Sequence, residues 1–373
     1  MLDKKILQGS FTLIGTMVGA GILALPYAFS KAGFLAGVFW LIILGIIMLF
    51  VHLYLGEVIL RTNKFHQLTG YAHKYLGNIG KNIMIFSMIF GIYSALIAYL
   101  IGEGQSFSFL FFGNESYTLF FGILFWFFMT LFLREGVKGM KEIALWGVFA
   151  VICIILGLFI WFAPQIKYSN LSNFNIELFF LPLGVVLFSL LGFSAIPEAG
   201  KIMQSSKKNF KKALVFGSII PIIVYFVFAL IFVGVLGDSI REVATLSLQK
   251  PAAFLGIFTM LTAYFILSFA LKDMFAIDLR IRRINVFILV SIIPLILFLL
   301  ITYFNFLDFT RVLSIGGVVS GGLTGIIILL MNYKSKKQGE REPEFKIPIN
   351  WFIIFLIGLI FVLGVLAEFW KFL

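Results

Sequence analysis

The chain has 373 residues, of which 61% are hydrophobic and only 12% are charged. Soluble domains carry about twice that charged fraction, so the composition excludes a soluble globule and indicates a protein embedded in lipid. The net charge of +12 does not indicate a nucleic-acid partner, because the positive residues lie between apolar runs, and one cysteine excludes a disulfide framework and a cysteine-based metal site.

Eleven apolar runs are each long enough to cross a bilayer as a helix. They predict an all-α integral membrane protein with spans at about 6–31, 34–60, 82–104, 117–133, 143–163, 177–200, 212–236, 252–276, 284–304, 309–331 and 347–370. Polar residues at 102–105 interrupt the apolar character after the third run. The charged segment 332–346 is predicted to be a cytoplasmic linker, which sets an additional helix within 347–373 apart from a core of residues 1–331.

The distribution of lysine and arginine predicts the orientation of these spans. With the N-terminus in the cytoplasm, the inner segments hold 23 of the 29 basic residues; they are the N-terminus, 61–81, 134–142, 201–212, 272–283 and 332–346. Such a bias is typical of cytoplasmic loops. We therefore expect a multi-pass protein of the cell membrane with an extracytoplasmic C-terminus, the lipid bilayer as its surroundings, and no obligatory protein partner.

The first and sixth runs contain matching interruptions. The first run places Gly15, Gly19 and Gly21 ahead of Pro26, and the sixth places Gly192 ahead of Pro197. Glycine and proline weaken a helix, and a break within a membrane is tolerated where it lines a cavity. The alternative is that Gly15-x-x-x-Gly19 is a helix-packing motif.

The two interrupted runs are five spans apart and therefore antiparallel. This arrangement predicts an inverted repeat of five plus five helices, with one repeat at about 6–163 and the other at about 177–331, and a substrate site near the midplane. The half-helix that follows a break presents free N–H groups, which suit a carboxylate.

Four stretches resemble helices of a known superfamily. They are GTMVGAGILALPYAFSKAGF, AYLIGEGQSF, LLGFSAIPEAGKIM and LTAYFILSFALKDMFAIDL. They are similar to helices 1, 3, 6 and 8 of the amino acid/auxin permease and aromatic amino acid permease families, within the amino acid–polyamine–organocation superfamily. The resemblance extends from about residue 8 to 331. It implies a LeuT-type fold with helices 1 and 6 broken.

The resemblance also implies roles for individual residues. The implied substrate-binding set is Thr16, Gly19, Ala20, Gly21, Tyr99, Phe188, Leu191, Gly192, Phe193 and Ser194. Within it, the amides at 19–21 and the Tyr99 hydroxyl would bind a carboxylate. Carbonyls near Thr16 and at 188–191 would receive an amino group, and Phe193 would close over the ligand.

A sodium site is implied at Gly15, Val18, Thr259, Thr262 and Ala263. Ala263 lacks the hydroxyl usual in such sites, and Phe188 and Leu190 replace polar ligands of a second sodium site. The histidine that many relatives have after the sixth-helix break is Ala195 here. The coupling ion, H⁺ or Na⁺, therefore stays open, and no other metal or cofactor is expected.

Three intramembrane carboxylates are candidates for coupling or gating, because a buried charge needs a reason. Glu57 is expected either at the membrane interface or bonded to the unwound sixth span. Glu103 lies one turn after Tyr99 and is expected in an outer vestibule, whereas Glu198 lies toward the cytoplasmic half. His52 is expected to be an interior hydrogen-bonded histidine rather than a proton relay.

These features together predict a secondary active transporter of amino acids, neutral or aromatic, working by alternating access and coupled to protons or sodium. Carriers of polyamines or nucleobases and a transporter-like nutrient sensor are the alternatives. A channel is not favoured because no polar pore stripe is visible. An enzyme is not expected, because the sequence offers no nucleophile–base pair or metal cluster.

Overall fold

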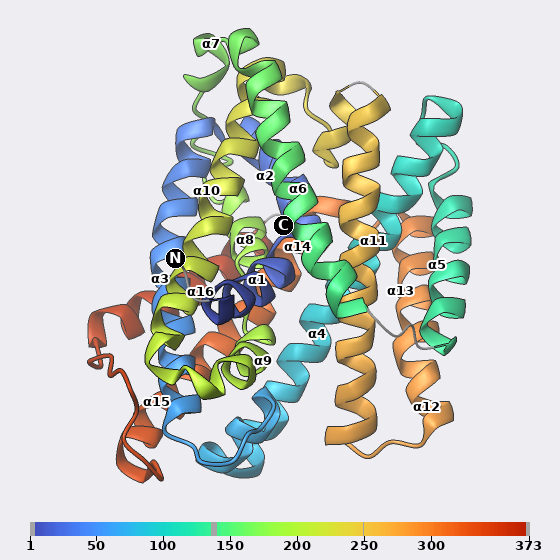
Figure 1. Cartoon of the computed structure of the whole chain (residues 1–373). Helices are drawn as coiled ribbons and strands as arrows, with labels where there is room; N and C mark the ends of the chain where they lie inside the picture. Colours follow the sequence, from blue (N-terminus) through green and yellow to red (C-terminus); the bar gives the residue numbers. More distant parts are fainter. Residues whose placement is uncertain (1–3, 136–139, 249, 371–373) are drawn as a thin grey trace.

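The computed structural model describes residues 4–135, 140–248 and 250–370 (Figure 1). Within them the structure is helical without strands. The α-helices are α1 (Lys4–Met17), α2 (Ala20–Ala32), α3 (Phe34–Leu60), α4 (Leu68–Phe112), α5 (Thr118–Glu135), α6 (Met140–Phe162), α7 (Tyr168–Leu171), α8 (Leu181–Ser189), α9 (Ala195–Ile202), α10 (Phe210–Leu236), α11 (Lys250–Asp273), α12 (Arg283–Phe287), α13 (Ile293–Phe304), α14 (Phe309–Gly316), α15 (Gly322–Gln338) and α16 (Trp351–Trp370). The prediction of an all-α protein is confirmed for these residues.

Each predicted span corresponds to a helix or to a series of helices in the structure. Six continuous helical stretches of the described residues are long and apolar enough to cross a membrane. Two of them, Arg283–Phe304 and Phe309–Gln338, each join several shorter helices, and the bent pair α1–α2 makes a seventh span. Helices α5, α6 and α16 carry shorter apolar stretches within the described residues. Part of the predicted inner segment 134–142, and residues 371–373 at the predicted outer C-terminus, lie outside them.

The first span is broken, with a bend of 57° between its halves. Helix α1 ends at Met17 and α2 begins at Ala20, so Val18 and Gly19 form the break. The backbone of Gly19 is non-helical (φ −138°, ψ −142°). The break was predicted at 19–21; it lies slightly earlier, because Gly21 already belongs to the second half-helix.

The sixth span is broken between α8 and α9, at residues 190–194. Helix α2 packs against α8, and α1 packs against α9. Helix α10 contacts α1, α2 and α3 and so supports both halves of the first span. Figure 1 shows these elements gathered in one part of the molecule, while α5, α11, α12 and α13 stand together at another side.

Helix α4 is longer than predicted at both ends. It contains a kink at Gly77, whose φ of +69° is the left-handed value that glycine adopts without strain. Residues 102–105, which interrupt the apolar character of the sequence, continue the helix beyond the predicted end of the span at 104. Part of the predicted inner loop 61–81 is also helical, from Leu68 onward.

The segment 332–346 is not a detached linker, because it is bonded to the end of α3. Helix α15 continues through it to Gln338. The Glu340 amide donates to the Arg61 carbonyl over 2.9 Å, and the Asn63 amide donates to the Glu340 carboxylate over 2.8 Å. The charged residues that were predicted to form a cytoplasmic linker are therefore part of the packed structure.

Glu57 forms the centre of this contact and is completely buried. Its carboxylate pairs with Arg61 at 2.9 Å and with the Lys336 ammonium at 2.8 Å. It also accepts from the Asn332 amide at 3.2 Å and from the Ile347 N–H at 3.0 Å. The prediction that Glu57 bonds the broken sixth span is wrong, because its partners come from the end of α3, from α15 and from Ile347. Its place near the membrane interface stays a prediction.

Replacing Glu57 with glutamine is expected to destabilise the protein by about 3–5 kcal/mol, because the buried Arg61 and the partly buried Lys336 lose their counter-charge. The measurement is denaturant or thermal unfolding of the purified protein in detergent. The control is Glu344→Gln, which breaks the half-buried pair with Arg341 and should cost about 1 kcal/mol or less. Equal losses in the two variants would contradict the central role of Glu57.

Candidate functional site

A pocket of about 660 Å³ lies between the two helix breaks. Its lining includes eight of the ten predicted substrate residues: Thr16, Gly19, Gly21, Tyr99, Phe188, Leu191, Phe193 and Ser194. Gly192 is outside the pocket and faces α1, since a Cβ placed on it would lie 2.6 Å from Leu13. The side chain of Ala20 lies outside the described part of the chain. The fold therefore brings most of the predicted residues together.

The pocket is also lined by residues that were not predicted from the sequence. Met88, Ile92 and Ala95 lie on α4 at spacings of three and four residues before Tyr99, so helical periodicity could have identified them. Ser320 and Thr324 come from the tenth span, where π-helical residues 317–321 join α14 to α15. In the sequence, the only sign of these two residues is that they are hydroxyl side chains within an apolar run.

The pocket is lined without a charged side chain among the described residues. Apolar and aromatic groups predominate, and hydroxyls supply most of the polar side chains. The N-terminus of α2 and the C-terminal ends of α1 and α8 lie at the breaks. The charged groups of a ligand would therefore meet backbone amides and carbonyls, which carry the partial charges of helix ends.

Two glycines allow close packing at the first break. A Cβ placed on Gly21 would lie 2.3 Å from the Ser189 hydroxyl and 2.8 Å from the Ser189 Cα. A Cβ on Gly19 would lie 2.8 Å from the Tyr99 hydroxyl and 3.3 Å from the Ala263 Cβ. The Tyr99 hydroxyl thus lies beside the first break, as predicted.

Tyr225 on α10 connects the two breaks and was not identified from the sequence. Its buried hydroxyl lies 2.7 Å from the Met17 carbonyl and 2.8 Å from the Ser189 carbonyl. Met17 ends α1 and Ser189 ends α8, so one phenol holds the ends of both half-helices. Because a phenol has a single proton, it can fully satisfy only one of the two carbonyls at a time.

Phe193 lies in the pocket wall and packs edge-on against His52, with ring centroids 5.5 Å apart. His52 is completely buried, and its Nδ1 lies 2.9 Å from the Ser218 hydroxyl. The interpretation of His52 as an interior hydrogen-bonded histidine agrees with this geometry. The ring of Phe193 is therefore supported from behind by α3.

The residues of the predicted sodium site lie on α1, in the first break and on α11. The Thr259 hydroxyl donates to the Leu255 carbonyl at 2.5 Å, and the Thr262 hydroxyl donates to the Phe258 carbonyl at 2.9 Å. Ala263 lies beside Gly19. Gly15 lies on α1 and Val18 lies in the break, and neither is in the pocket lining. A sodium role for this set stays a prediction.

Glu103 is completely buried in this structure, and its place in an outer vestibule stays a prediction. Neither of its carboxyl oxygens has a hydrogen-bond partner among the described residues. Glu198 lies on α9 and accepts from the Gln67 amide at 3.2 Å, just before α4 begins. It joins α9 to the segment after α3, which agrees with its predicted place; a gating role stays a prediction.

Glu242 lies in the connection between α10 and α11 and contacts the start of α14. Burial raises the pKa of its carboxyl to about 8, and the negative charge of Asp308 acts in the same direction. The N–H groups of Phe309 and Thr310 bond the carboxylate and oppose this shift. The charged residues nearby are paired: Arg241 with Glu115 and Arg311 with Asp308; Tyr27 is the remaining titratable neighbour.

This shift predicts that stability falls as pH rises. Between about 4.5, the ordinary glutamate value, and about 8, folded Glu242 keeps a proton that the unfolded chain has lost, so rising pH favours unfolding. The melting temperature of Glu242→Gln should therefore fall less than that of the parent between pH 5 and 8.5. Exposed Glu177→Gln is the control; a slope unchanged by Glu242→Gln would refute the prediction.

The chain is similar in sequence to a family of known permeases. The model of the tryptophan/tyrosine permease family matches residues 2–247. The tyrosine-specific transport system 1 of Haemophilus influenzae is 26% identical over 263 residues, which cover 67% of this chain and 64% of that protein. The glutamine transporter 2 of Aliivibrio fischeri is 24% identical, with 62% of each chain covered. The chain thus spans less than two thirds of the length of these relatives.

A solved structure establishes the fold. The crystal structure of MhsT in complex with L-phenylalanine has a TM-score of 0.66 to this chain and covers 99% of each chain, at 16% sequence identity. The similarity confirms the predicted LeuT-type fold, with its broken first and sixth spans.

Proposed function

Because the chain belongs to the tryptophan/tyrosine permease family, we propose that it is a secondary active transporter of neutral amino acids with apolar or aromatic side chains. The observation that carries this proposal is a pocket at two helix breaks whose described lining has no charged side chain. Such a pocket suits a zwitterion whose charges are met by the backbone.

The ends of the half-helices supply complementary partial charges for an amino acid. The first amides of α2, with the Tyr99 hydroxyl beside Gly19, would bind the carboxylate. The carbonyls of Met17 and Ser189, at the C-terminal ends of α1 and α8, would attract the ammonium group. The same arrangement leaves the ligand side chain to the rest of the pocket.

The remaining wall favours an apolar side chain. It is formed largely by Met88, Ile92, Phe188, Leu191 and Phe193. A tyrosine-specific relative and a structural neighbour that holds L-phenylalanine support this choice. Because one relative is a glutamine transporter, a polar neutral amino acid is the alternative substrate. A polyamine is disfavoured, because its cationic groups would find no carboxylate in the described lining.

The pocket extends from the breaks to Leu68, the first residue of α4. That end of the molecule carries the basic segments around residues 61–81 and 201–212, which we assign to the cytoplasm of a cell membrane. With this orientation the structure is an inward-facing state. Transport would then proceed by alternating access around the breaks.

We assign the coupling role to protons, with Glu103 as the carrier. An unpartnered carboxyl in a fully enclosed position is costly when charged, so it gains or loses a proton together with a change in its surroundings. It lies one helical turn from Tyr99, beside the substrate pocket. Sodium is the alternative, and the hydroxyls of Thr259 and Thr262 would then be its ligands.

The test is uptake of labelled amino acids into proteoliposomes, with a pH gradient and a sodium gradient imposed separately. Tyrosine, phenylalanine, tryptophan and glutamine should be compared with putrescine. Uptake of an aromatic amino acid driven by the pH gradient is expected. Uptake driven by sodium alone would overturn the proton assignment, and transport of no amino acid would overturn the substrate class.

Glu103→Gln separates coupling from substrate binding. The amide has the same shape but holds no exchangeable charge, so the variant should bind the substrate yet lose most of the pH-gradient stimulation, by about tenfold or more. Counterflow exchange, which needs no net proton movement, should be largely kept. The control is Glu115→Gln at the outer ion pair with Arg241; full stimulation in Glu103→Gln would exclude Glu103 as the carrier.

A further inference from the structure

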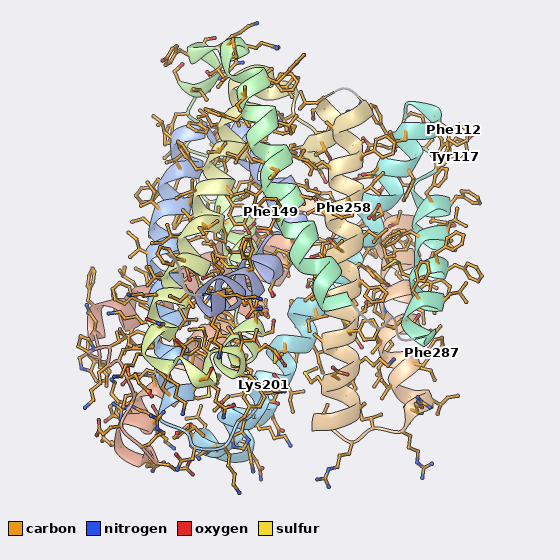
Figure 2. The ribbon with its side chains drawn as sticks, in the orientation of Figure 1. Phe112, Tyr117, Phe149, Lys201, Phe258 and Phe287 are labelled. Atoms are coloured by element: carbon orange, nitrogen blue, oxygen red, sulfur yellow. The ribbon has the colours of Figure 1, made fainter. Side chains whose placement is uncertain are left out.

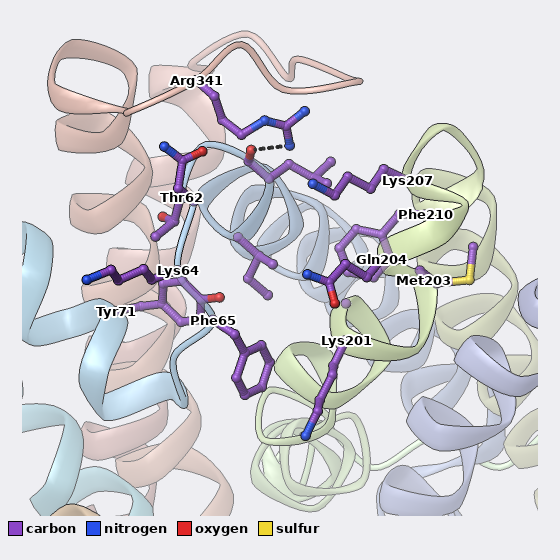
Figure 3. A pocket seen from close by; sticks show the side chains of 14 residues that line it. Thr62, Lys64, Phe65, Tyr71, Lys201, Met203, Gln204, Lys207, Phe210 and Arg341 are labelled. Carbon is purple, nitrogen blue, oxygen red and sulfur yellow. Dashed lines mark hydrogen bonds between the residues drawn. The ribbon is translucent and has the colours of Figure 1, made fainter.

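A second pocket, of about 470 Å³, lies away from the helix breaks. It is formed where α3 ends and α10 begins, together with α9, the start of α4 and Arg341 (Figure 3). Three separate parts of the chain, within 59–71, within 200–210 and at Arg341, therefore meet in it. It shares no lining residue with the substrate pocket.

The lining contains four cationic side chains and no carboxylate: Lys64, Lys201, Lys207 and Arg341. Arg341 is held in place, since it donates to the Leu60 carbonyl at 2.9 Å and pairs with Glu344 at 2.7 Å. The three lysines form no ion pair within 4 Å among the described residues. Glu344, which already pairs with Arg341, is close enough to interact with Lys207. The cavity is nevertheless surrounded by more positive than negative side chains.

The rest of the wall combines apolar side chains with the polar groups of Thr62, Asn63, Tyr71 and Gln204. Leu60, Met203 and Phe210 are buried beside the cavity, and the ring of Phe65 at its rim is 41% exposed. The Lys201 ammonium lies 5.5 Å from the centre of the Phe65 ring. A cationic rim beside polar hydrogen-bonding groups suits an anionic head, and the apolar part of the wall suits the first carbons of an attached chain.

The depth of the pocket also fits such a ligand. Leu60 is the last residue of α3 and Phe210 is the first residue of α10, so the cavity lies where two spans leave the hydrocarbon layer. Phospholipid headgroups occupy this level, and basic pockets between helices on the cytoplasmic side are suited to anionic ones. From position, charge and wall chemistry we propose that this pocket binds the phosphodiester headgroup of an anionic phospholipid.

A bound headgroup would connect two parts of the molecule. Lys64 lies between α3 and α4, whereas Lys201 lies on α9, the half-helix that follows the sixth-span break. Bridging these lysines holds α9 against the segment after α3. The site therefore offers a route by which lipid composition acts on a half-helix that begins directly after Ser194 in the pocket wall.

The test measures binding of acyl-labelled phosphatidylglycerol to the full chain in detergent micelles. The variant replaces Lys64, Lys201 and Lys207 with glutamine. The control replaces Lys208, Lys211 and Lys212, which lie close by in sequence and do not line the pocket. Each basic residue near an anionic lipid contributes roughly 1 kcal/mol, or about fivefold in affinity.

Phosphatidylglycerol binding is expected to weaken at least tenfold in the pocket variant and less than twofold in the control. Equal weakening in both would show diffuse attraction and overturn the site. Equal binding of phosphatidylcholine, or displacement of the lipid by an equal concentration of inorganic phosphate, would overturn the lipid assignment. The single variant Lys201→Gln repeats the measurement if the triple variant does not remain monodisperse, and binding is read without reference to transport.

Discussion

Gly21→Leu is expected to abolish amino acid uptake, with a loss of at least about 100-fold. The reason is the contact between α2 and α8: a Cβ at Gly21 already approaches the Ser189 Cα to 2.8 Å, and that atom belongs to the backbone. A leucine must therefore push the two half-helices apart, and overpacking of this kind costs about 1–3 kcal/mol or more. The displaced half-helices are those that form the proposed carboxylate and ammonium sites.

The matched control is Gly157→Leu on α6. Gly157 is exposed on its helix, and a Cβ placed there meets nothing within 4 Å. The measurements are uptake of labelled tyrosine in proteoliposomes and the amount of protein recovered from the membrane. Normal uptake by Gly21→Leu would refute the location of the site, whereas equal loss in Gly157→Leu would assign the effect to bulk in a membrane helix.

Tyr225→Phe is expected to reduce uptake by about 10- to 100-fold while the protein remains folded. The variant removes the hydroxyl that joins the Met17 and Ser189 carbonyls and leaves both in a buried place without that donor. Each unsatisfied buried group costs about 1–3 kcal/mol, and 1.4 kcal/mol corresponds to tenfold in rate or affinity. Uptake is expected to fall because the two breaks no longer keep their relative position.

Tyr93→Phe provides the control, because Tyr93 also donates its hydroxyl to a carbonyl, that of Leu289 at 2.7 Å. That bond lies outside the lining of the substrate pocket. Both variants lose one hydroxyl and should lose similar stability, but only Tyr225→Phe should raise the KM for the substrate. The same KM in the two variants would show that Tyr225 has a structural role alone.

Much of the substrate pocket followed from patterns within single helices. Gly19 and Gly192, each followed by a proline, marked the two broken spans, and the resemblance of the third span to its relatives placed Tyr99 beside the first break. Met88, Ile92 and Ala95 share the face of Tyr99, and helical spacing alone predicts this. Local signals therefore located the two breaks, whereas most of the predicted wall came from the resemblance to the family.

The errors have a common physical origin. Glu57 was assigned to the membrane interface or to the sixth span, but its partners Lys336 and Ile347 are almost 300 positions away along the chain. The same contact turned the supposed linker into part of the packed structure. The expected place of Glu103 in an outer vestibule came from the helix face that it shares with Tyr99, and in this structure neighbouring helices enclose it. Figure 2 shows how densely side chains fill the spaces between helices, so polarity along the chain does not report exposure.

The sequence by itself determined the spans and the two breaks, because hydrocarbon requires continuous apolar helices and a glycine–proline interruption weakens a helix wherever it occurs. Only the tertiary structure decided which groups meet. The hydroxyl of Tyr225, the ion pairs of Glu57 and the lysines of the second pocket each depend on helices distant in sequence. The physical reason is that helix formation is a local property, whereas the partner of a buried polar group is set by the packing of the whole bundle.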